Sequence, residues 1–281
     1  MVVSNYFYKV GTEVLEDRIQ LLDNREQYMT QQYTKLFKNE LSAIELDGKT
    51  AVLYVGGVGV HNSESRKYTG EYTCSQELLV DGPVIKSLQA YSMHKYIGIL
   101  DKKNDITYAN ISGDTCASSL YSLYEAERLL RDNVVDNVVV IAEEKTSFNT
   151  IRIFHEHNID VKPGEGFACV VLQRDGEGYS ITDTKWEYKY NRNPFLVDSD
   201  GYAKVKTEAK LVKGHKTGTV QNDEAEAEVF GETFGYKDKI GHCQGASGLI
   251  EVCMVMDDKL DDVVCLASGL GGFYGSCKVS R

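Results

Sequence analysis

Tyr108-Ala-Asn-Ile-Ser-Gly-Asp-Thr-Cys116-Ala-Ser-Ser-Leu120 carries a β-prone segment through small residues directly into a helix. The pattern predicts a short strand over residues 106–111 and an amphipathic helix over 117–131, with leucine and alanine side chains on one broad face. Cys116 lies at the sharp turn between the two. A strand, a tight turn and a helix in this order are typical of a layered α/β protein.

The turn at Cys116 has two chemical consequences. The macrodipole of the following helix favours a thiolate over a thiol at its N-terminus. The first backbone N–H groups of that helix have no partner inside the helix, so they can stabilise an oxyanion. An isolated cysteine at a helix start is more often a small apolar residue that simply packs there. This turn alone therefore does not establish a nucleophile.

The rest of the chain continues the alternation of strands and helices. Strands are expected at 50–60, 137–142, 167–173, 178–189 (as the hairpin partner of the preceding strand), 209–212, 263–267 and 278–280. Helices are expected at 13–38, 79–99, 223–234 and 246–260. Because no low-complexity linker interrupts this pattern, the sequence predicts one compact α/β domain over residues 1–281.

The composition is that of a globular protein with an acidic surface. Of 281 residues, 42% are hydrophobic and 26% are charged. The 31 Lys+Arg against 42 Asp+Glu give a net charge of −11. This negative charge disfavours non-specific binding to nucleic acid. No apolar run approaches the roughly 18 residues that a membrane helix needs, and we expect no signal peptide. Seven scattered cysteines without a Cys-x-x-Cys pair indicate a cytoplasmic protein.

Two histidines stand in glycine-rich loops that each precede a predicted helix. The first loop is His215-Lys-Thr-Gly-Thr-Val-Gln-Asn-Asp-Glu-Ala-Glu226, and the second is Lys237-Asp-Lys-Ile-Gly-His242-Cys-Gln-Gly-Ala-Ser-Gly-Leu-Ile-Glu251. Glycine allows the close backbone approach with which such a loop presents an imidazole. Together with Cys116, the two loops form a cysteine–histidine arrangement for nucleophilic catalysis.

These three segments resemble the active-site motifs of the β-ketoacyl synthases, the condensing enzymes of the thiolase-fold superfamily. The cysteine turn is similar to the nucleophile elbow of that family, and the two histidine loops resemble its histidine motifs in the same order. Ser268-Gly-Leu-Gly-Gly272 and Lys162-Pro-Gly-Glu-Gly-Phe-Ala168 resemble two of its glycine-rich segments. With 281 residues the chain would be an unusually short member.

The resemblance implies catalytic roles for the matched residues. Cys116 would take an acyl group from a carrier thioester. His215 and His242 would assist the decarboxylation of a malonyl-type extender and stabilise its enolate. The backbone N–H groups of Cys116 and Leu270 would form the oxyanion hole.

Three further residues match supporting positions of the family. They are Asp223, Lys237 and Glu251, and a buried lysine–glutamate pair among them would orient the histidines. The resemblance implies no cofactor and no metal. His155-Glu-His157 has a metal-ligand spacing but is more typical of a surface loop.

The resemblance also implies the thiolase-like layered fold. Its two related α/β halves would each carry a mixed five-stranded sheet, with helices between and outside the sheets. Residues 1–178 would hold the nucleophile and residues 179–281 both histidines, with the site at the junction. The implied partners are an acyl-carrier protein or a coenzyme A thioester, with no membrane insertion and no nucleic acid. The implied assembly is a homodimer, or a heterodimer with another ketosynthase-like subunit.

Two departures from the family pattern leave the reaction open. Lys216 stands where the family has a glycine, and Leu270 replaces the phenylalanine that usually gates the pocket. The chain therefore fits three functions: decarboxylative Claisen condensation in fatty-acid or polyketide-type biosynthesis, acyl transfer to an amine, alcohol or thiol, or a non-catalytic subunit that shapes a partner's pocket. Retention of Cys116 and both histidines favours catalysis.

A group of lysines surrounds His215 in the sequence. Its members are Lys204, Lys206, Lys210, Lys213 and Lys216. Acyl-carrier proteins are typically acidic, so the net charge of −11 on this chain should slow its encounter with a carrier protein. A local basic patch would instead favour docking of the carrier. The group fits such a docking patch and a solvated strand edge equally well.

Overall fold

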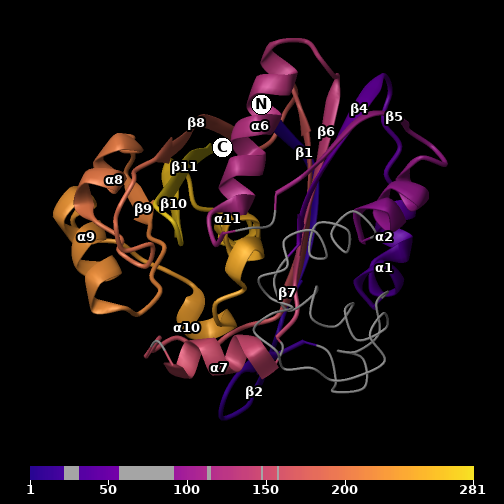
Figure 1. Ribbon diagram of the computed structural model, residues 1–281. Coiled ribbons are helices and arrows are strands. Elements are labelled where there is room, and N and C mark those ends of the chain that lie inside the picture. The colour runs from indigo at the N-terminus through magenta and orange to yellow at the C-terminus, as the bar shows by residue number, and fades with distance from the viewer. Residues whose placement is uncertain (22–31, 57–91, 113–114, 147, 157) are drawn as a thin grey trace.

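A mixed sheet of nine strands forms the frame of the described chain (Figure 1). The computed structural model describes residues 1–21, 32–56, 92–112, 115–146, 148–156 and 158–281. Across the sheet the strands follow the order β5-β4-β6-β7-β1-β8-β11-β10-β9. Their bounds are β1 (Val2–Val10), β4 (Lys49–Gly56), β5 (Asp105–Ile111), β6 (Asn137–Glu144), β7 (Gly166–Gln173), β8 (Ser180–Tyr188), β9 (Leu211–Lys213), β10 (Val263–Gly269) and β11 (Phe273–Ser280).

The sheet has two parts that are joined at one corner. The first part holds β5, β4, β6, β7 and β1, with β4 parallel to both neighbours and β7 antiparallel to both of its own. The second holds β8, β11, β10 and β9, of which only β10 and β9 run parallel. The register pair Val2↔Ser180 connects β1 to β8. The first part has the expected five strands, whereas four are described in the second, because residues 189–210 form one short helix and no strand.

Helices fill the space between the two parts and cover their outer faces. α6 (Ser118–Arg131) and α11 (Ser247–Asp257) lie between the parts (Figure 1), where apolar side chains from both parts surround them in the largest core cluster. Alternate strand residues point the other way and pack under the outer helices in two smaller clusters. This is the layered α/β arrangement expected from the sequence.

The outer helices divide between the two parts. α1 (Gln32–Leu36), α2 (Lys38–Ser42) and helical residues 92–100 cover the first part, and α8 (Ser199–Lys204) and α9 (Val220–Phe230) cover the second. The remaining helices are α7 (Phe148–Glu156), α10 (Lys237–Ile240) and the single 3₁₀ turn η2 (Gln244–Ala246).

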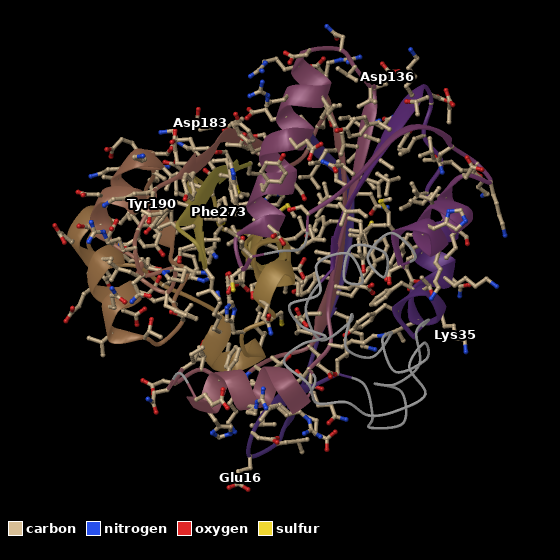
Figure 2. The ribbon with its side chains drawn as sticks, viewed as in Figure 1. Glu16, Lys35, Asp136, Asp183, Tyr190 and Phe273 are labelled. Carbon is tan, nitrogen blue, oxygen red and sulfur yellow. The ribbon has the colours of Figure 1, made fainter. Side chains whose placement is uncertain are left out.

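The central strand β1 has no counterpart among the predicted elements, and its position corrects one of them. β1 lies between β7 and β8, so β8 pairs with β11 and is not the hairpin partner of β7. The helix expected over 13–38 is also wrong at its start. There β2 (Glu13–Val14) and β3 (Ile19–Gln20) pair as a hairpin, and Glu16 at its tip points away from the body (Figure 2).

The other predicted strands and helices are found with shifted ends. Two predicted ends lie outside the described residues. One is the glycine-rich end, beyond Gly56, of the strand expected at 50–60. The other is the start of the helix expected at 79–99. His155 belongs to the last turn of α7 instead of a loop, and residue 157 is not described. The expected boundary between the two halves of the chain, at 178/179, falls in the turn between β7 and β8. The structural relation of the two halves to each other stays a prediction. Among the described helices, none has the length and apolar character to cross a membrane.

Candidate active site

Cys116 lies at the turn between β5 and α6, where side-chain hydrogen bonds shape the backbone. Thr115 Oγ1 accepts from the N–H of Ala117 at 3.2 Å, and Ser118 Oγ accepts from the N–H of Thr115 at 3.1 Å. A Cβ atom at Gly269 would lie 2.5 Å from Cβ of Thr115. Only glycine therefore lets the end of β10 pack this closely on the cysteine turn. The predicted strand–turn–helix setting of Cys116 is confirmed.

The Cys116 thiol is held in its protonated form. The residue is partly exposed, but burial of the sulfur raises its pKa to about 11. The cation of Lys237 acts in the opposite direction, and the carboxylate of Glu144 adds to the rise. The thiolate expected at this helix N-terminus is therefore wrong for this site, because desolvation disfavours the charged form of the sulfur. The proton must leave as the sulfur attacks.

Alkylation of Cys116 by iodoacetamide is expected to be slow at neutral pH. Since the thiolate is the reactive form and the pKa is about 11, about one thiol in a thousand is ionised at pH 8. The rate constant should rise by about tenfold per pH unit between pH 7 and pH 9.5. Peptide mapping by mass spectrometry measures it separately from the other cysteines. A plateau of the rate below pH 8 would contradict this account.

His242 lies in the turn between α10 and η2 and is fixed from several sides. Its N–H donates to the carbonyl of Lys162 at 2.7 Å, and its carbonyl accepts from the N–H of Gly164 at 3.1 Å. Gly241, with a φ of +73°, makes the turn that this pairing requires. Nδ1 of His242 lies 3.1 Å from Oγ of Ser247. In the tautomer that has its ring proton on Nε2, Nδ1 accepts from this hydroxyl.

His215 lies in the loop between β9 and α9, and Glu226 anchors this loop. Oε1 of Glu226 accepts from the backbone N–H of His215 at 2.8 Å and of Lys216 at 3.1 Å, and from the amide of Asn222 at 2.9 Å. Asp223 instead accepts from its neighbour Asn222 at 3.2 Å. The sequence analysis assigned no role to Glu226. It belongs to the same motif and lies on α9 three residues after Asp223, so helical spacing is the signal that could have found it.

The nucleophile and the two histidines predicted from the sequence meet in space. Sγ of Cys116 and one ring nitrogen of each of His215 and His242 lie within 4.8 Å of one another. The two imidazole centroids are 5.3 Å apart at an interplanar angle of 81°. Burial lowers the pKa of both histidines well below its usual value, and the cations of Lys237 and Lys213 act in the same direction. Both rings are therefore neutral at pH 7 and can donate a ring N–H.

Lys237 and Glu251 form the expected buried pair, with Nζ 2.7 Å from Oε1. Lys213, which the sequence placed among surface lysines, is the second partner of Glu251, with Nζ 2.5 Å from Oε2. All three side chains are buried. Burial alone would raise the pKa of the Glu251 carboxyl, but the two lysines bring it below its usual value. Glu251 is therefore ionised between two cations.

Leu270 and Lys216, the two departures from the family pattern, border the site. Leu270 lies in the turn after β10 and is 51% exposed, and the N–H of Gly271 fixes this turn on the carbonyl of Pro194 at 2.8 Å. Lys216 has a φ of 49° and places the carbon stem of its side chain against Gly235. The participation of the Leu270 N–H in an oxyanion hole stays a prediction.

The group of lysines near His215 divides in the structure. Lys213 is buried and Lys216 half-buried, whereas Lys204, Lys206 and Lys210 are exposed. A docking role therefore stays a prediction for these three exposed lysines alone.

The cysteine and the two histidines are also the group of described side chains whose donor atoms lie close enough to share a metal ion. The cations of Lys213 and Lys237 act on both imidazoles. Like charges repel at short range inside a protein, so this environment favours an anion over a metal cation. The chemistry of the group suits an oxyanion or an enolate.

Comparisons with known proteins agree with this geometry. Residues 201–259 match the family model described as "Beta-ketoacyl synthase, C-terminal domain". This segment holds both histidines, Lys237, Glu226 and Glu251. No curated protein matches the chain in sequence.

Solved structures share the fold at low sequence identity. A β-ketoacyl synthase from Burkholderia phymatum STM815 is 15% identical with a TM-score of 0.65, over 84% of this chain and 76% of that chain. The type II polyketide ketosynthase of the complex AntDE:AntF is 14% identical with a TM-score of 0.65, over 100% and 98%. The 3-oxoacyl-[acyl-carrier-protein] synthase III from Aquifex aeolicus VF5 is 15% identical with a TM-score of 0.58, over 100% and 99%.

These matches confirm the resemblance that the cysteine and histidine motifs indicate. The chain has the thiolase-like fold of the β-ketoacyl synthases, and its residues 201–259 are similar to the C-terminal domain of that family.

Proposed function

We propose that this chain is a ketosynthase-like acyltransferase that joins two acyl units by decarboxylative Claisen condensation. One observation carries the proposal: Sγ of Cys116 and a ring nitrogen of each of His215 and His242 lie within 4.8 Å of one another. A thiol nucleophile beside two neutral N–H donors suits both halves of this reaction.

In the first half, Cys116 takes the acyl group by thioester exchange. Its sulfur attacks the carbonyl carbon of the donor, the donor's C–S bond breaks, and the leaving sulfur departs as a thiol with the proton that Cys116 loses. Because the pKa of Cys116 is about 11, this proton moves during the attack. The backbone N–H groups of Cys116 and Leu270 stabilise the oxyanion.

In the second half, a malonyl-type thioester loses carbon dioxide. As its carbon–carbon bond breaks, negative charge gathers on the thioester oxygen, and His215 and His242 each donate a ring N–H to it. The carbanion then attacks the acyl carbonyl on Cys116. The new carbon–carbon bond forms, and the cysteine sulfur leaves and takes up a proton. Lys237, which is paired with Glu251, places a positive charge near both imidazoles for this step.

An acyl-carrier protein or a coenzyme A thioester supplies the substrates in this proposal, in fatty-acid or polyketide-type biosynthesis. The complex AntDE:AntF contains an acyl-carrier protein with its ketosynthase, and the exposed Lys204, Lys206 and Lys210 offer an acidic carrier a local basic patch. The six described cysteines are free thiols, which supports the reducing cytoplasm as the compartment.

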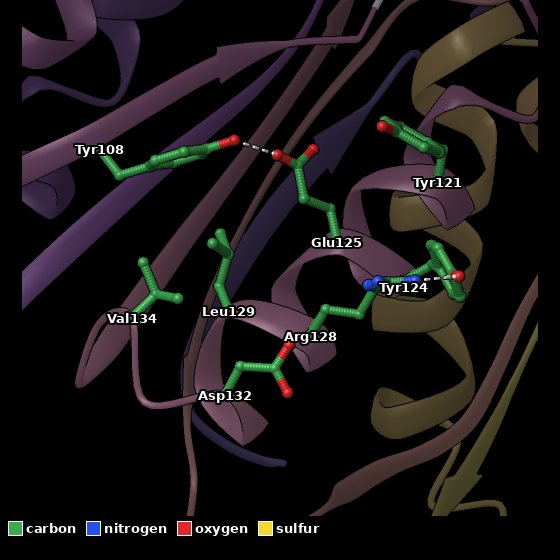
Figure 3. Close-up of a pocket in the computed structure, with 8 residues that line it drawn as sticks. All are labelled: Tyr108, Tyr121, Tyr124, Glu125, Arg128, Leu129, Asp132 and Val134. Carbon is green, nitrogen blue, oxygen red and sulfur yellow. Dashed lines mark hydrogen bonds between the residues drawn. The ribbon is translucent and has the colours of Figure 1, made fainter.

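Homodimerisation is proposed through the outer edge of β5. In the described sheet β5 pairs only with β4, and an open strand edge is a template for pairing with a second chain. Beside this edge lies a hollow of about 310 Å³ between β5 and α6 (Figure 3). Tyr108 reaches across it to Glu125 at 2.7 Å, and Arg128 donates to the hydroxyl of Tyr124 at 2.7 Å.

Two other functions have specific support. The exposed Leu270 leaves the turn beside the nucleophile open to an amine, alcohol or thiol acceptor, which favours plain acyl transfer. The ishigamide ketosynthase/chain length factor is 14% identical with a TM-score of 0.59 over 84% of this chain and 74% of that chain. Its pairing of a ketosynthase with a second factor supports the alternative of a partner subunit. The cysteine and both histidines favour the catalytic subunit.

The experiment combines two readouts on the purified chain. Incubation with a panel of acyl-carrier thioesters should add one acyl mass to Cys116, measured by intact-mass and peptide mass spectrometry. Addition of malonyl-carrier thioester should then release carbon dioxide and a β-ketoacyl product. Acylation without release of carbon dioxide would replace the proposal by plain acyl transfer. No acylation by any donor would support the pocket-shaping subunit.

A further inference from the structure

Lys213 is a buried lysine at the end of an edge strand. β9 has three residues and pairs with β10, where Lys213 lies opposite Cys265. The side chain has no solvent exposure. Its Nζ donates to the carbonyl of Leu266 at 3.0 Å and lies 2.5 Å from Oε2 of Glu251. A buried ammonium group needs such partners because its desolvation costs several kcal/mol.

Glu251 is shared by two lysines from different elements. Nζ of Lys237, from α10, lies 2.7 Å from Oε1 of Glu251, and Nζ of Lys213, from β9, lies on the other oxygen, Oε2. The three side chains Lys213, Lys237 and Glu251 together carry two positive charges and one negative charge. The carboxylate of Glu226 on α9 also acts on both lysines, less strongly than that of Glu251, and its Oε1 accepts from the backbone of the His215 loop.

The excess positive charge acts on the proposed catalytic groups. Lys237 and Lys213 both lower the pKa of His215 and of His242, after the larger effect of burial, and the His242 ring also lowers that of His215. The titratable thiol of Cys116 completes the group. Burial lowers the pKa of both lysines. For Lys213 the attraction to Glu251 outweighs this effect, so its pKa is raised, whereas the pKa of Lys237 is lowered. Lys213 is therefore the more firmly protonated of the two lysines.

We propose that Lys213 is a positioning residue of the active site: it shares Glu251 with Lys237 and gives the buried cluster an excess of positive charge, which adds to the effect of burial in disfavouring protonation of both imidazoles. This inference rests on the proposed function, because neutral N–H donors are what an enolate oxygen requires. The same excess charge stabilises the anion that forms between His215 and His242. Lys213 acts through Glu251 and through space, and it touches no substrate.

The test measures the titration of the two histidines by NMR in the whole chain. Their ring signals are assigned with His215→Asn and His242→Asn. In Lys213→Met the pKa of both rings should rise by about one unit, and the acidic limb of the pH–activity profile should shift to higher pH by the same amount. Lys210→Met, which removes an exposed lysine three residues earlier, should shift neither.

A second variant separates charge from packing. Lys213→Met/Glu251→Gln removes one positive and one negative charge, so the excess of one positive charge returns and the histidine pKa values should return toward those of the natural chain. An unchanged histidine pKa in Lys213→Met, or no return in the double variant, would overturn the proposal. If Lys213→Met does not fold, the double variant against Glu251→Gln supplies the comparison. The NMR readout needs no condensation, so it stands apart from a failure of the proposed function.

Discussion

A chain with Cys116→Ala is expected to form no acyl-enzyme and to lose at least about 10³-fold in condensation rate. Alanine removes the sulfur on which the acyl group is carried, and the two histidines have no other described thiol beside them. The fold should stay intact, because Cys116 is partly exposed and makes its turn through Thr115 and Ser118. Intact-mass spectrometry and product formation from acyl and malonyl thioesters measure the two losses.

Cys253→Ala is the matched control for this prediction. Cys253 is a buried cysteine on α11, so its replacement removes a sulfur from the core and leaves the cysteine–histidine group unchanged. This variant should form the acyl-enzyme at the natural rate. An acyl adduct that persists in Cys116→Ala would move the nucleophile to another residue and refute the assigned site.

Replacing Glu251 by alanine is expected to lower the free energy of unfolding by about 3–5 kcal/mol. The substitution leaves the ammonium groups of Lys213 and Lys237 buried without the carboxylate that lies 2.5 Å and 2.7 Å from them. Urea denaturation at pH 7 measures the change. Glu228→Ala, an exposed position on α9, should change stability by less than about 0.5 kcal/mol.

The same carboxylate sets part of the pH dependence of stability. The pKa of Glu251 in the folded chain lies below its usual value, so its contribution is present above the unfolded pKa and is lost as the pH falls through the folded pKa. Stability of the natural chain should therefore fall in acid through this group, and Glu251→Ala should lose that part of the dependence. An equal acid dependence in both chains would contradict the assignment.

The elements that the sequence predicted correctly are those whose signals lie in neighbouring residues of the chain. α6, β6, β7, β10 and α11 follow from the spacing of apolar residues and from the turns that flank them. β1 was missed, and with it the pairing of β8, because the position of a strand in a sheet depends on partners far away in sequence. Its partner β7 begins at Gly166.

The candidate site shows the same division. Cys116, His215 and His242 stand in motifs of fixed spacing, so their convergence was predicted. The anchor of the His215 loop, Glu226, could be found from helical spacing, while Lys213 could not. A lysine at a short strand end is usually solvated, and only the tertiary contact with Glu251 buries it. Burial of Cys116 likewise decided against a thiolate there, since desolvation is a property of the folded surroundings.

The position of β1 also constrains the order in which the chain folds. Residues 2–10 pair along β7, which begins about 160 residues later, and Val2 pairs with Ser180. Until that distant segment exists, β1 has neither of its neighbours, and its aromatic and apolar side chains have no layer to join. Such non-local pairing raises the contact order and slows folding. The joint that unites the two parts of the sheet therefore cannot form in a growing chain before residue 180 exists, although its other half is made much earlier.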